Sequence, residues 1–164
     1  MTTPAIPSTL RPVDHSALRV NQALIISLLA LAFVLNVPWL VVAVALIMGL
    51  GTLRGQPGFR WVYTGLLKPR GWVRPDLLQD NPEPHIFAQG FGAAVVWAGA
   101  IALLAGVQTA GWALVGLVIA LAALNLFARF CAGCAVYYWL GRLRVPGFSK
   151  APPADTFPGL RPPG

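Results

Sequence analysis

Two long apolar blocks dominate the chain, at residues 23–53 and 91–126, and neither contains a lysine or an arginine. As continuous helices, blocks of this length would extend about 46 to 54 Å, well beyond the ~30 Å hydrocarbon core of a bilayer. Each block therefore predicts two membrane spans joined by a tight turn. We expect the first turn at Asn36-Val37-Pro38, because proline lacks an N–H and disfavours a helical residue before it. We expect the second at Gln108–Gly111.

This pattern predicts an all-α integral membrane protein, a four-helix bundle made of two helical hairpins in one domain over residues 17–148. The spans are expected at about 17–35, 38–53, 85–107 and 112–143, with the last third of the fourth helix lying at the membrane interface. Residues 1–16 form an irregular N-terminal arm, and the Pro-rich tail, 149–164, is expected to be disordered. The content of 57% hydrophobic and 10% charged residues agrees with a membrane protein.

The positive charges indicate how the bundle is oriented. All 12 lysines and arginines fall in the N-terminal arm and first helix start, the central loop at 54–84, or the segment after residue 128. Neither predicted turn is charged, so four spans place every basic residue and both termini in the cytoplasm, at the inner membrane. Two spans would put the central loop outside and violate this rule. The net charge of +7 then reflects loops facing anionic lipid, and no nucleic-acid partner is expected.

The central loop contains an amphipathic stretch. Apolar residues recur there at helical spacing, namely Phe59, Val62, Tyr63, Leu66 and Leu67. With Trp61 and Trp72 nearby, this spacing predicts an interfacial helix under the cytoplasmic leaflet. The alternative is a hairpin or coil that folds against the bundle.

The only two cysteines form the sequence Cys131-Ala132-Gly133-Cys134, near the cytoplasmic end of the fourth predicted span. On a helix, side chains at this spacing share one face and lie close enough for a disulfide. The spacing serves dithiol exchange, half of a metal site, or sulfur relay through a persulfide. The alternative is that both thiols pack as small apolar groups between helices. Because Arg129 is close to Cys131, we expect Cys131 to be the attacking thiol and Cys134 the resolving one.

His15 and His85 are the only histidines, and the predicted topology puts both on the cysteine side. Their spacing from the cysteines matches no zinc finger, so we expect neither a metal nor a cofactor. Amide side chains inside or bordering the spans should face the bundle interior, either joining helices or lining a polar site. These are Asn21, Gln22, Gln89 and Asn125. No acidic residue lies within a predicted span, which argues against a carboxylate proton relay.

Three local motifs, Arg19–Gln22, Pro84–Gln89 and Phe130–Tyr137, resemble the signatures of a bacterial four-span membrane family known as domain of unknown function 4395 (DUF4395). The resemblance covers about residues 12–148. Some members of that family are joined to, or encoded beside, thioredoxin-like or rhodanese-like domains, which implies thiol or sulfur chemistry. Carried onto this chain, the resemblance points to Asn21, Gln22, His85, Gln89, Cys131 and Cys134, with Tyr137 in the third motif.

We therefore predict a membrane-embedded thiol/disulfide or sulfur-relay protein that acts through Cys131 and Cys134 with a separate cytoplasmic thioredoxin-like or rhodanese-like partner. Whether it is an enzyme, and whether it forms a homo-oligomer, are left open. The binding or polar-lining residues are expected to be Asn21, Gln22, His85, Gln89, Asn125 and Tyr137. One alternative is a transporter that passes a small sulfur species along Gln22, Gln89 and Asn125. Another is a structural or assembly subunit in which the cysteines only pack.

Overall fold

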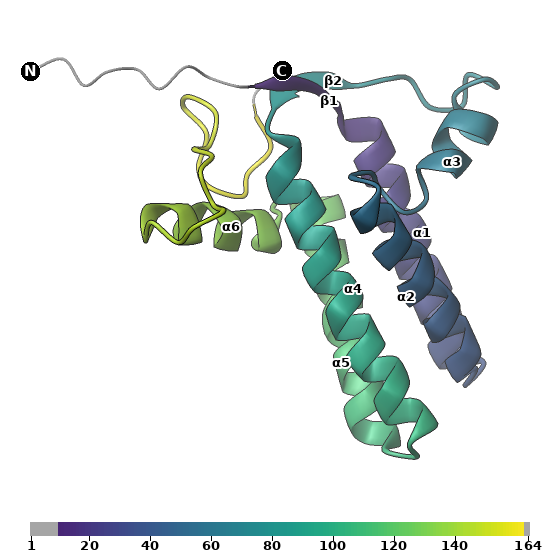
Figure 1. The fold of residues 1–164 in the computed structure, drawn as a ribbon. Coiled ribbons are helices and arrows are strands. Elements are labelled where there is room, and N and C mark those ends of the chain that lie inside the picture. Colours follow the sequence, from purple (N-terminus) through teal and green to yellow (C-terminus); the bar gives the residue numbers. More distant parts are fainter. Residues whose placement is uncertain (1–9, 163–164) are drawn as a thin grey trace, which may run out of the picture.

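The computed structural model describes residues 10–162, and this part of the chain is mostly helical (Figure 1). Helices α1 (His15–Val34) and α2 (Pro38–Leu53) form one antiparallel hairpin, and α4 (Pro82–Leu104) and α5 (Gln108–Ala128) form the other. The remaining elements are β1 (Arg11–Asp14), α3 (Arg60–Val62), the π-helical segment η1 (Tyr63–Leu67), β2 (Leu77–Asp80) and α6 (Ala132–Arg142).

Three helices of the described chain are long and apolar enough to cross a membrane. They are α1, α4 and α5, with 20, 23 and 21 residues. At 1.5 Å per residue they reach about 30 to 35 Å, which matches the hydrocarbon thickness. Helix α2 is equally apolar but has only 16 residues. The fold is thus that of a multi-pass membrane protein, and a fourth crossing by α2 belongs to the proposal below.

Both hairpins close through the same backbone motif, in which the residue two positions beyond the helix cap bonds back to the last turn. After α1, Asn36 adopts a φ of 50° and the Val37 N–H donates to the Ala32 carbonyl at 2.9 Å. The second turn repeats this with Gly106, whose φ is 84°, and a Val107 N–H bond to Ala102. The first turn is where the sequence predicts it. The second is earlier than predicted, because α4 ends at Leu104 and Gln108 already begins α5.

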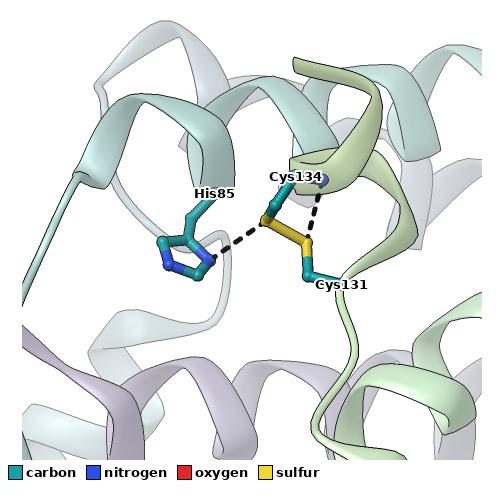
Figure 2. Close-up of side chains that lie close together, drawn as sticks. All are labelled: His85, Cys131 and Cys134. Atoms are coloured by element: carbon teal, nitrogen blue, oxygen red, sulfur yellow. Dashed lines mark hydrogen bonds between the residues drawn. A yellow bond between two sulfur atoms is a disulfide. The ribbon is translucent and has the colours of Figure 1, made fainter. Parts of the chain in front are cut away.

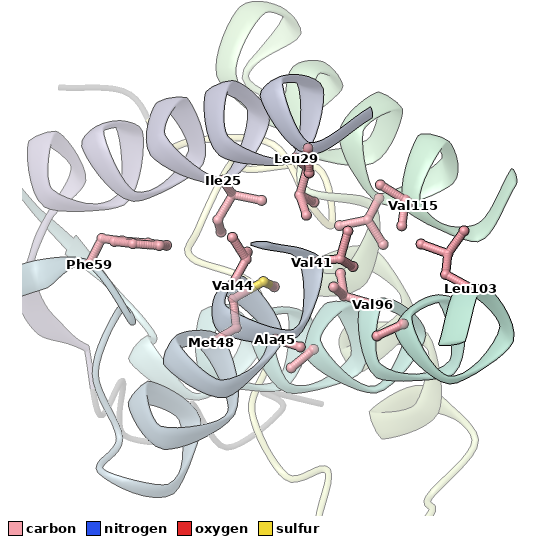
Figure 3. Packing of buried hydrophobic residues seen from close by; sticks show 14 residues of the cluster. Ile25, Leu29, Val41, Val44, Ala45, Met48, Phe59, Val96, Leu103 and Val115 are labelled. Carbon is pink, nitrogen blue, oxygen red and sulfur yellow. The ribbon is translucent and has the colours of Figure 1, made fainter. Parts of the chain in front are cut away.

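Branched and other apolar side chains fill the space between the four long helices (Figure 3). The cluster includes Ile25, Leu29, Val41, Val44, Val96 and Val115. Helices α4 and α5 approach closely enough that a Cβ added at Gly111 would lie 2.5 Å from Leu103 Cγ. The bundle interior at this level is therefore packed and apolar.

The single helix predicted over 112–143 is wrong, because the chain breaks between α5 and α6. Arg129 takes a left-handed conformation with φ 56°, and the Cys131 N–H donates to the Gly159 carbonyl at 2.7 Å. Phe130 forms a β-bridge with Leu160. Pairing with the tail thus replaces the helical hydrogen bonds, and α6 projects sideways from the bundle rather than continuing along it (Figure 1).

The termini are more ordered than the sequence suggests. Strand β1 pairs antiparallel with β2, with Arg11 opposite Asp80 and Asp14 opposite Leu77, so an irregular arm is wrong for these residues. The predicted disorder is also wrong for tail residues 149–162, where Arg161 forms an ion pair with Asp76. The rest of the predicted arm and tail, residues 1–9 and 163–164, lies outside the described residues.

The amphipathic stretch is helical, as α3 and η1, but its two most buried members face the protein. Phe59 and Tyr63 are buried, and the Tyr63 hydroxyl donates to Asp14 Oδ2 at 2.7 Å. Burial, together with the hydrogen bond and charge of Asp14, raises the pKa of Tyr63 to about 12. Trp61 and Trp72 are exposed. One side of the stretch therefore packs on the bundle, and its tryptophans face outward. That these tryptophans lie at the membrane interface stays a prediction.

A crossing by α2 predicts opposite labelling of its two ends. In a background with both cysteines replaced by alanine, single cysteines at Val37 and Thr109 should react with an impermeant maleimide in intact spheroplasts. A cysteine at Lys68 should react only after lysis, because basic loops stay cytoplasmic. Labelling of Lys68→Cys in intact spheroplasts, on the same side as Val37→Cys, would show that α2 does not cross.

Candidate functional site

The two cysteines are joined by a disulfide at the start of α6 (Figure 2). Cys131 is the N-cap of that helix, with extended backbone, and its Sγ accepts the Cys134 N–H at 3.1 Å. The exposed fractions are 6% for Cys131 and 2% for Cys134. A helix N-terminus presents free N–H groups and the positive end of the helix dipole. When the pair is reduced, this position favours negative charge on the Cys131 sulfur.

A histidine lies directly behind Cys134. His85 Nδ1, from the first turn of α4, is 3.5 Å from Cys134 Sγ (Figure 2). Its Nε2 is 2.9 Å from Asp80 Oδ2. A carboxylate at Nε2 holds the proton on that nitrogen, so in the neutral ring the Nδ1 lone pair faces the sulfur. Asp80 therefore orients His85 as an acceptor for the Cys134 thiol proton.

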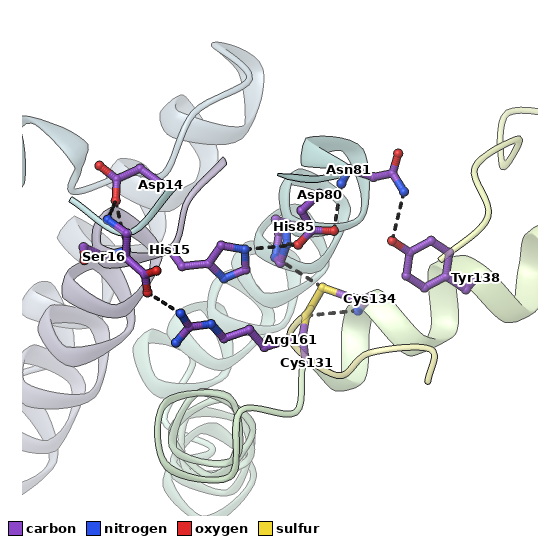
Figure 4. A network of polar contacts seen from close by, with 11 residues as sticks. Asp14, His15, Ser16, Asp80, Asn81, His85, Cys131, Cys134, Tyr138 and Arg161 are labelled. Carbon is purple, nitrogen blue, oxygen red and sulfur yellow. Dashed lines mark hydrogen bonds and ion pairs between the residues drawn. A yellow bond between two sulfur atoms is a disulfide. The ribbon is translucent and has the colours of Figure 1, made fainter. Parts of the chain in front are cut away.

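Asp80 is the charged centre of this network (Figure 4). Its Oδ1 accepts the Asn81 N–H at 2.7 Å, and His15 Nε2 lies 3.2 Å from Oδ2, without regular hydrogen-bond geometry. Burial alone would raise the pKa of Asp80. The contacts with His15 and His85, the charge of His85 and the hydrogen bond from the Asn81 backbone together outweigh it, and the pKa of Asp80 lies well below its ordinary value. Asp80 is thus ionised at neutral pH although it is buried.

Asn81 connects this centre to α6 and the tail. Its Nδ2 donates to the Tyr138 hydroxyl at 3.3 Å (Figure 4) and to the Ala151 carbonyl at 2.8 Å. Burial raises the pKa of Tyr138 to about 12, in spite of the Asn81 hydrogen bond. The phenol therefore stays neutral at physiological pH and serves as a fixed polar anchor for α6.

A pocket of about 50 Å³ lies over the disulfide and is lined by both cysteines, His15, Asp80 and His85. Of the residues predicted from sequence, Gln22 and Asn125 line it together with the cysteines and His85. Three arginines surround the same pocket, namely Arg19, Arg129 and Arg161. The site is thus a small pocket against the disulfide with both polar and apolar walls, and most of its charged side chains are cationic.

Asn21 and Gln89 do not line the pocket over the disulfide but form hydrogen bonds between segments of the fold. Asn21 Oδ1 accepts the buried Phe59 N–H at 2.9 Å, and its Nδ2 donates to Gln89 Oε1 at 3.2 Å. Gln89 Oε1 also accepts the Gly58 N–H at 3.0 Å, while its Nε2 donates to the Gln56 carbonyl at 3.0 Å. The two amides therefore clamp the loop at 56–59 to α1 and α4, which matches the helix-joining role considered for them.

Tyr137 packs in an aromatic cluster rather than on the wall of the pocket over the disulfide. Its ring centroid is 5.7 Å from that of Phe87 and 5.0 Å from that of Phe148. The residues that sequence reasoning missed are Asp80, Asn81 and Tyr138. The one signal in the sequence for Asp80 was its position five residues before His85, just ahead of the helix that contains this histidine.

Metal binding by this site depends on the redox state of the cysteines. His85, Cys131 and Cys134 bring three ligand-type atoms within 4.8 Å of one another, and so do His15, Asp80 and His85. A sulfur in a disulfide is not a thiolate ligand, so the first set would hold a metal only after reduction.

The hydrogen bonds by which Asn21 and Gln89 hold the loop at 56–59, here called the clamp, can be tested by mutation. Gln89→Leu leaves the Gly58 N–H and the Asn21 amide without their partner, and an unpaired buried polar group costs about 1–3 kcal/mol. We expect a lower melting temperature in detergent than for wild type. Gln108→Leu, at the exposed start of α5, is the matched control and should melt like wild type. Equal melting of both variants would contradict the clamp.

The chain was compared with known proteins. No curated protein and no solved structure matches it. The family model described as domain of unknown function (DUF4395) matches residues 13–142, which include the clamp, His85 and both cysteines. On this match over most of its length, the chain belongs to the DUF4395 family.

Proposed function

We propose that this protein carries out thiol–disulfide exchange at the surface of a membrane, with Cys131 as the sulfur that meets the substrate and Cys134 as the resolving thiol. The observation that carries the proposal is the disulfide at the start of α6 with the His85–Asp80 pair directly behind Cys134. A pair that only packs between helices requires neither a helix N-terminus nor an oriented histidine.

In the reduced protein, the Cys131 thiolate attacks one sulfur of a substrate disulfide and releases the other substrate sulfur as a thiolate. His85 Nδ1 then takes the proton of Cys134, and the resulting thiolate attacks Cys131 Sγ. This breaks the mixed disulfide, frees the second substrate thiolate and closes the Cys131–Cys134 bond. The substrate gains two electrons and the pair loses two. The same steps run backwards when the pair oxidises a dithiol.

The proposed setting is the cytoplasmic face of the inner membrane, with four crossings and both termini inside. The two strands, α3, α6 and the tail gather toward the bundle end opposite the two hairpin turns (Figure 1). The basic residues of the chain lie in these segments, in the loops that join them to the bundle, and in the first turns of α1, as cytoplasmic retention requires.

The partner we propose is a cytoplasmic thioredoxin-like or rhodanese-like protein, because the pocket over the disulfide lies among these loops. Sulfur relay through a Cys131 persulfide is the other form of this proposal, since it uses the same nucleophile and the same base.

Transport of a small sulfur species has less support. A polar solute needs a polar route across the membrane, but the space between the helices is filled by apolar side chains such as Leu29, Val44 and Val96. The Gln89 amide, which a route would need, is held in the clamp.

Thiol trapping tests exchange directly. Alkylation of the purified protein should detect two thiols after dithiothreitol and none after mild oxidation. Cys134→Ala should accumulate a mixed disulfide with a model disulfide substrate, because the resolving thiol is missing, whereas Cys131→Ala should form none. If neither cysteine of the folded protein reacts with the alkylating reagent, before or after a cycle of reduction and oxidation, the exchange and relay forms of the proposal fail together.

The role of His85 has its own test. His85→Ala should slow resolution of the mixed disulfide by about 100-fold, the lower end for loss of a general base, and leave its formation on Cys131 unchanged. Asp80→Asn should slow the same step, because the amide no longer fixes the proton on Nε2. Tyr137→Phe, on the same helix as Cys134 but off the pocket, is the control. Resolution at the wild-type rate in His85→Ala would remove the base from the mechanism.

A further inference from the structure

A second pocket reaches the disulfide from the side of the membrane-spanning helices. It measures about 80 Å³ and lies between α1, α4 and α5, with the first turn of α6 as its end wall. Cys131 lines this pocket as well as the polar one. The other walls are mostly apolar, including Ile25, Val95, Val118 and Leu121. Phe91 and Leu121 are also exposed on the outer surface of the helices, so the pocket opens where acyl chains would lie.

Two amide side chains stand between the pockets. Gln22 of α1 and Asn125 of α5 line both of them, beside Cys131. Within residues 10–162, neither side chain makes a hydrogen bond to another group of the chain. Polar side chains in membrane helices are costly without a partner and mark sites of function. In contrast to Asn21 and Gln89, these two amides are available to a ligand.

We propose that the apolar pocket binds a lipid-soluble quinone, which accepts the electrons of the reduced Cys131–Cys134 pair. This inference rests on the exchange function proposed above. Three features of the pocket define the ligand. Its apolar opening toward the lipid requires an apolar group, and the Gln22 and Asn125 amides require carbonyl oxygens that accept hydrogen bonds. Its contact with Cys131 requires a redox centre that can reach this sulfur. A quinone combines all three, whereas an acyl chain has only the first.

The size of the pocket limits how the ring sits. Its volume of about 80 Å³ is smaller than the ~150 Å³ cavity that encloses a whole benzene molecule. The edge of the ring that carries one carbonyl therefore enters between Gln22 and Asn125. The rest of the ring and its isoprenoid chain lie outward along Phe91 and Leu121.

The electrons and protons balance in two steps. The Cys131 thiolate adds to the quinone ring and forms a carbon–sulfur bond, and the ring takes up one proton. Cys134, deprotonated by His85, attacks Cys131 Sγ, the carbon–sulfur bond breaks, and its electron pair stays on the ring. The ring takes a second proton and leaves as hydroquinone. The pair loses two electrons and the quinone gains two, with the thiol proton released through His85 to the polar pocket.

The test uses full-length protein in nanodiscs, reduced, desalted and mixed anaerobically with decylubiquinone. We expect one equivalent of quinone to be reduced per protein, with loss of both thiols. Leu121→Trp fills the mouth of the pocket and should lower the rate at least tenfold. Leu117→Trp is the matched control, because Leu117 lies one turn earlier on α5, is 49% exposed and does not line the pocket. The soluble oxidant diamide should oxidise all three proteins equally.

The outcomes separate this inference from the exchange function. Oxidation by diamide without oxidation by decylubiquinone overturns the quinone site and leaves exchange standing. Equal rates with decylubiquinone for Leu121→Trp and Leu117→Trp show that quinone does not use this pocket, which also overturns it. Thiols that react with neither oxidant overturn both proposals.

Discussion

The buried carboxylate of Asp80 is the interaction on which the arrangement of the site depends. An ionised carboxylate away from water costs several kcal/mol unless donors surround it. Its contacts come from both hairpins: His85 at the start of α4 and the Asn81 N–H are hydrogen-bonded to it, and His15 Nε2 at the start of α1 lies 3.2 Å away. The charge therefore holds the two helix starts together. The same contact turns His85 so that its other nitrogen faces Cys134, so one carboxylate serves both the fold and the chemistry.

Much of the helical framework could be predicted from the sequence, because its signals are local. Apolar blocks longer than one span, with Asn36 and Pro38 in the first, led to the two hairpins. The break after α5 could not be predicted in the same way, since residues 128–143 have ordinary helical composition. That break is set by tertiary pairing, in which Phe130 meets Leu160 and Cys131 meets Gly159. Asp80 was missed for the same reason, because its contact with His15 depends on strands β1 and β2, whose paired residues are 63 to 69 positions apart in the sequence.

The amides show how finely the site depends on tertiary context. Asn21 and Gln22 are adjacent in sequence, but adjacent positions on a helix point about 100° apart. One side chain reaches the loop at 56–59, whose backbone N–H groups need acceptors, and the other reaches the two pockets at the disulfide. The sequence marks both as polar groups at the same depth. Only the position of the loop decides that Asn21 joins helices and leaves Gln22 without a partner.

The break at Arg129 has a cost and a consequence. A non-glycine residue in the left-handed region costs about 1 kcal/mol, and the helix loses hydrogen bonds that the tail must replace. In a continuous helix, the N–H groups around Cys131 and Cys134 would all be bonded to the preceding turn. Ending α5 and starting α6 at Cys131 frees the N–H groups of a first helical turn, and Cys134 donates one of them to the Cys131 sulfur. A thiolate at Cys131 is therefore stabilised by the interruption of the helix, so the feature that departs most from the predicted span is also the one on which the proposed exchange depends.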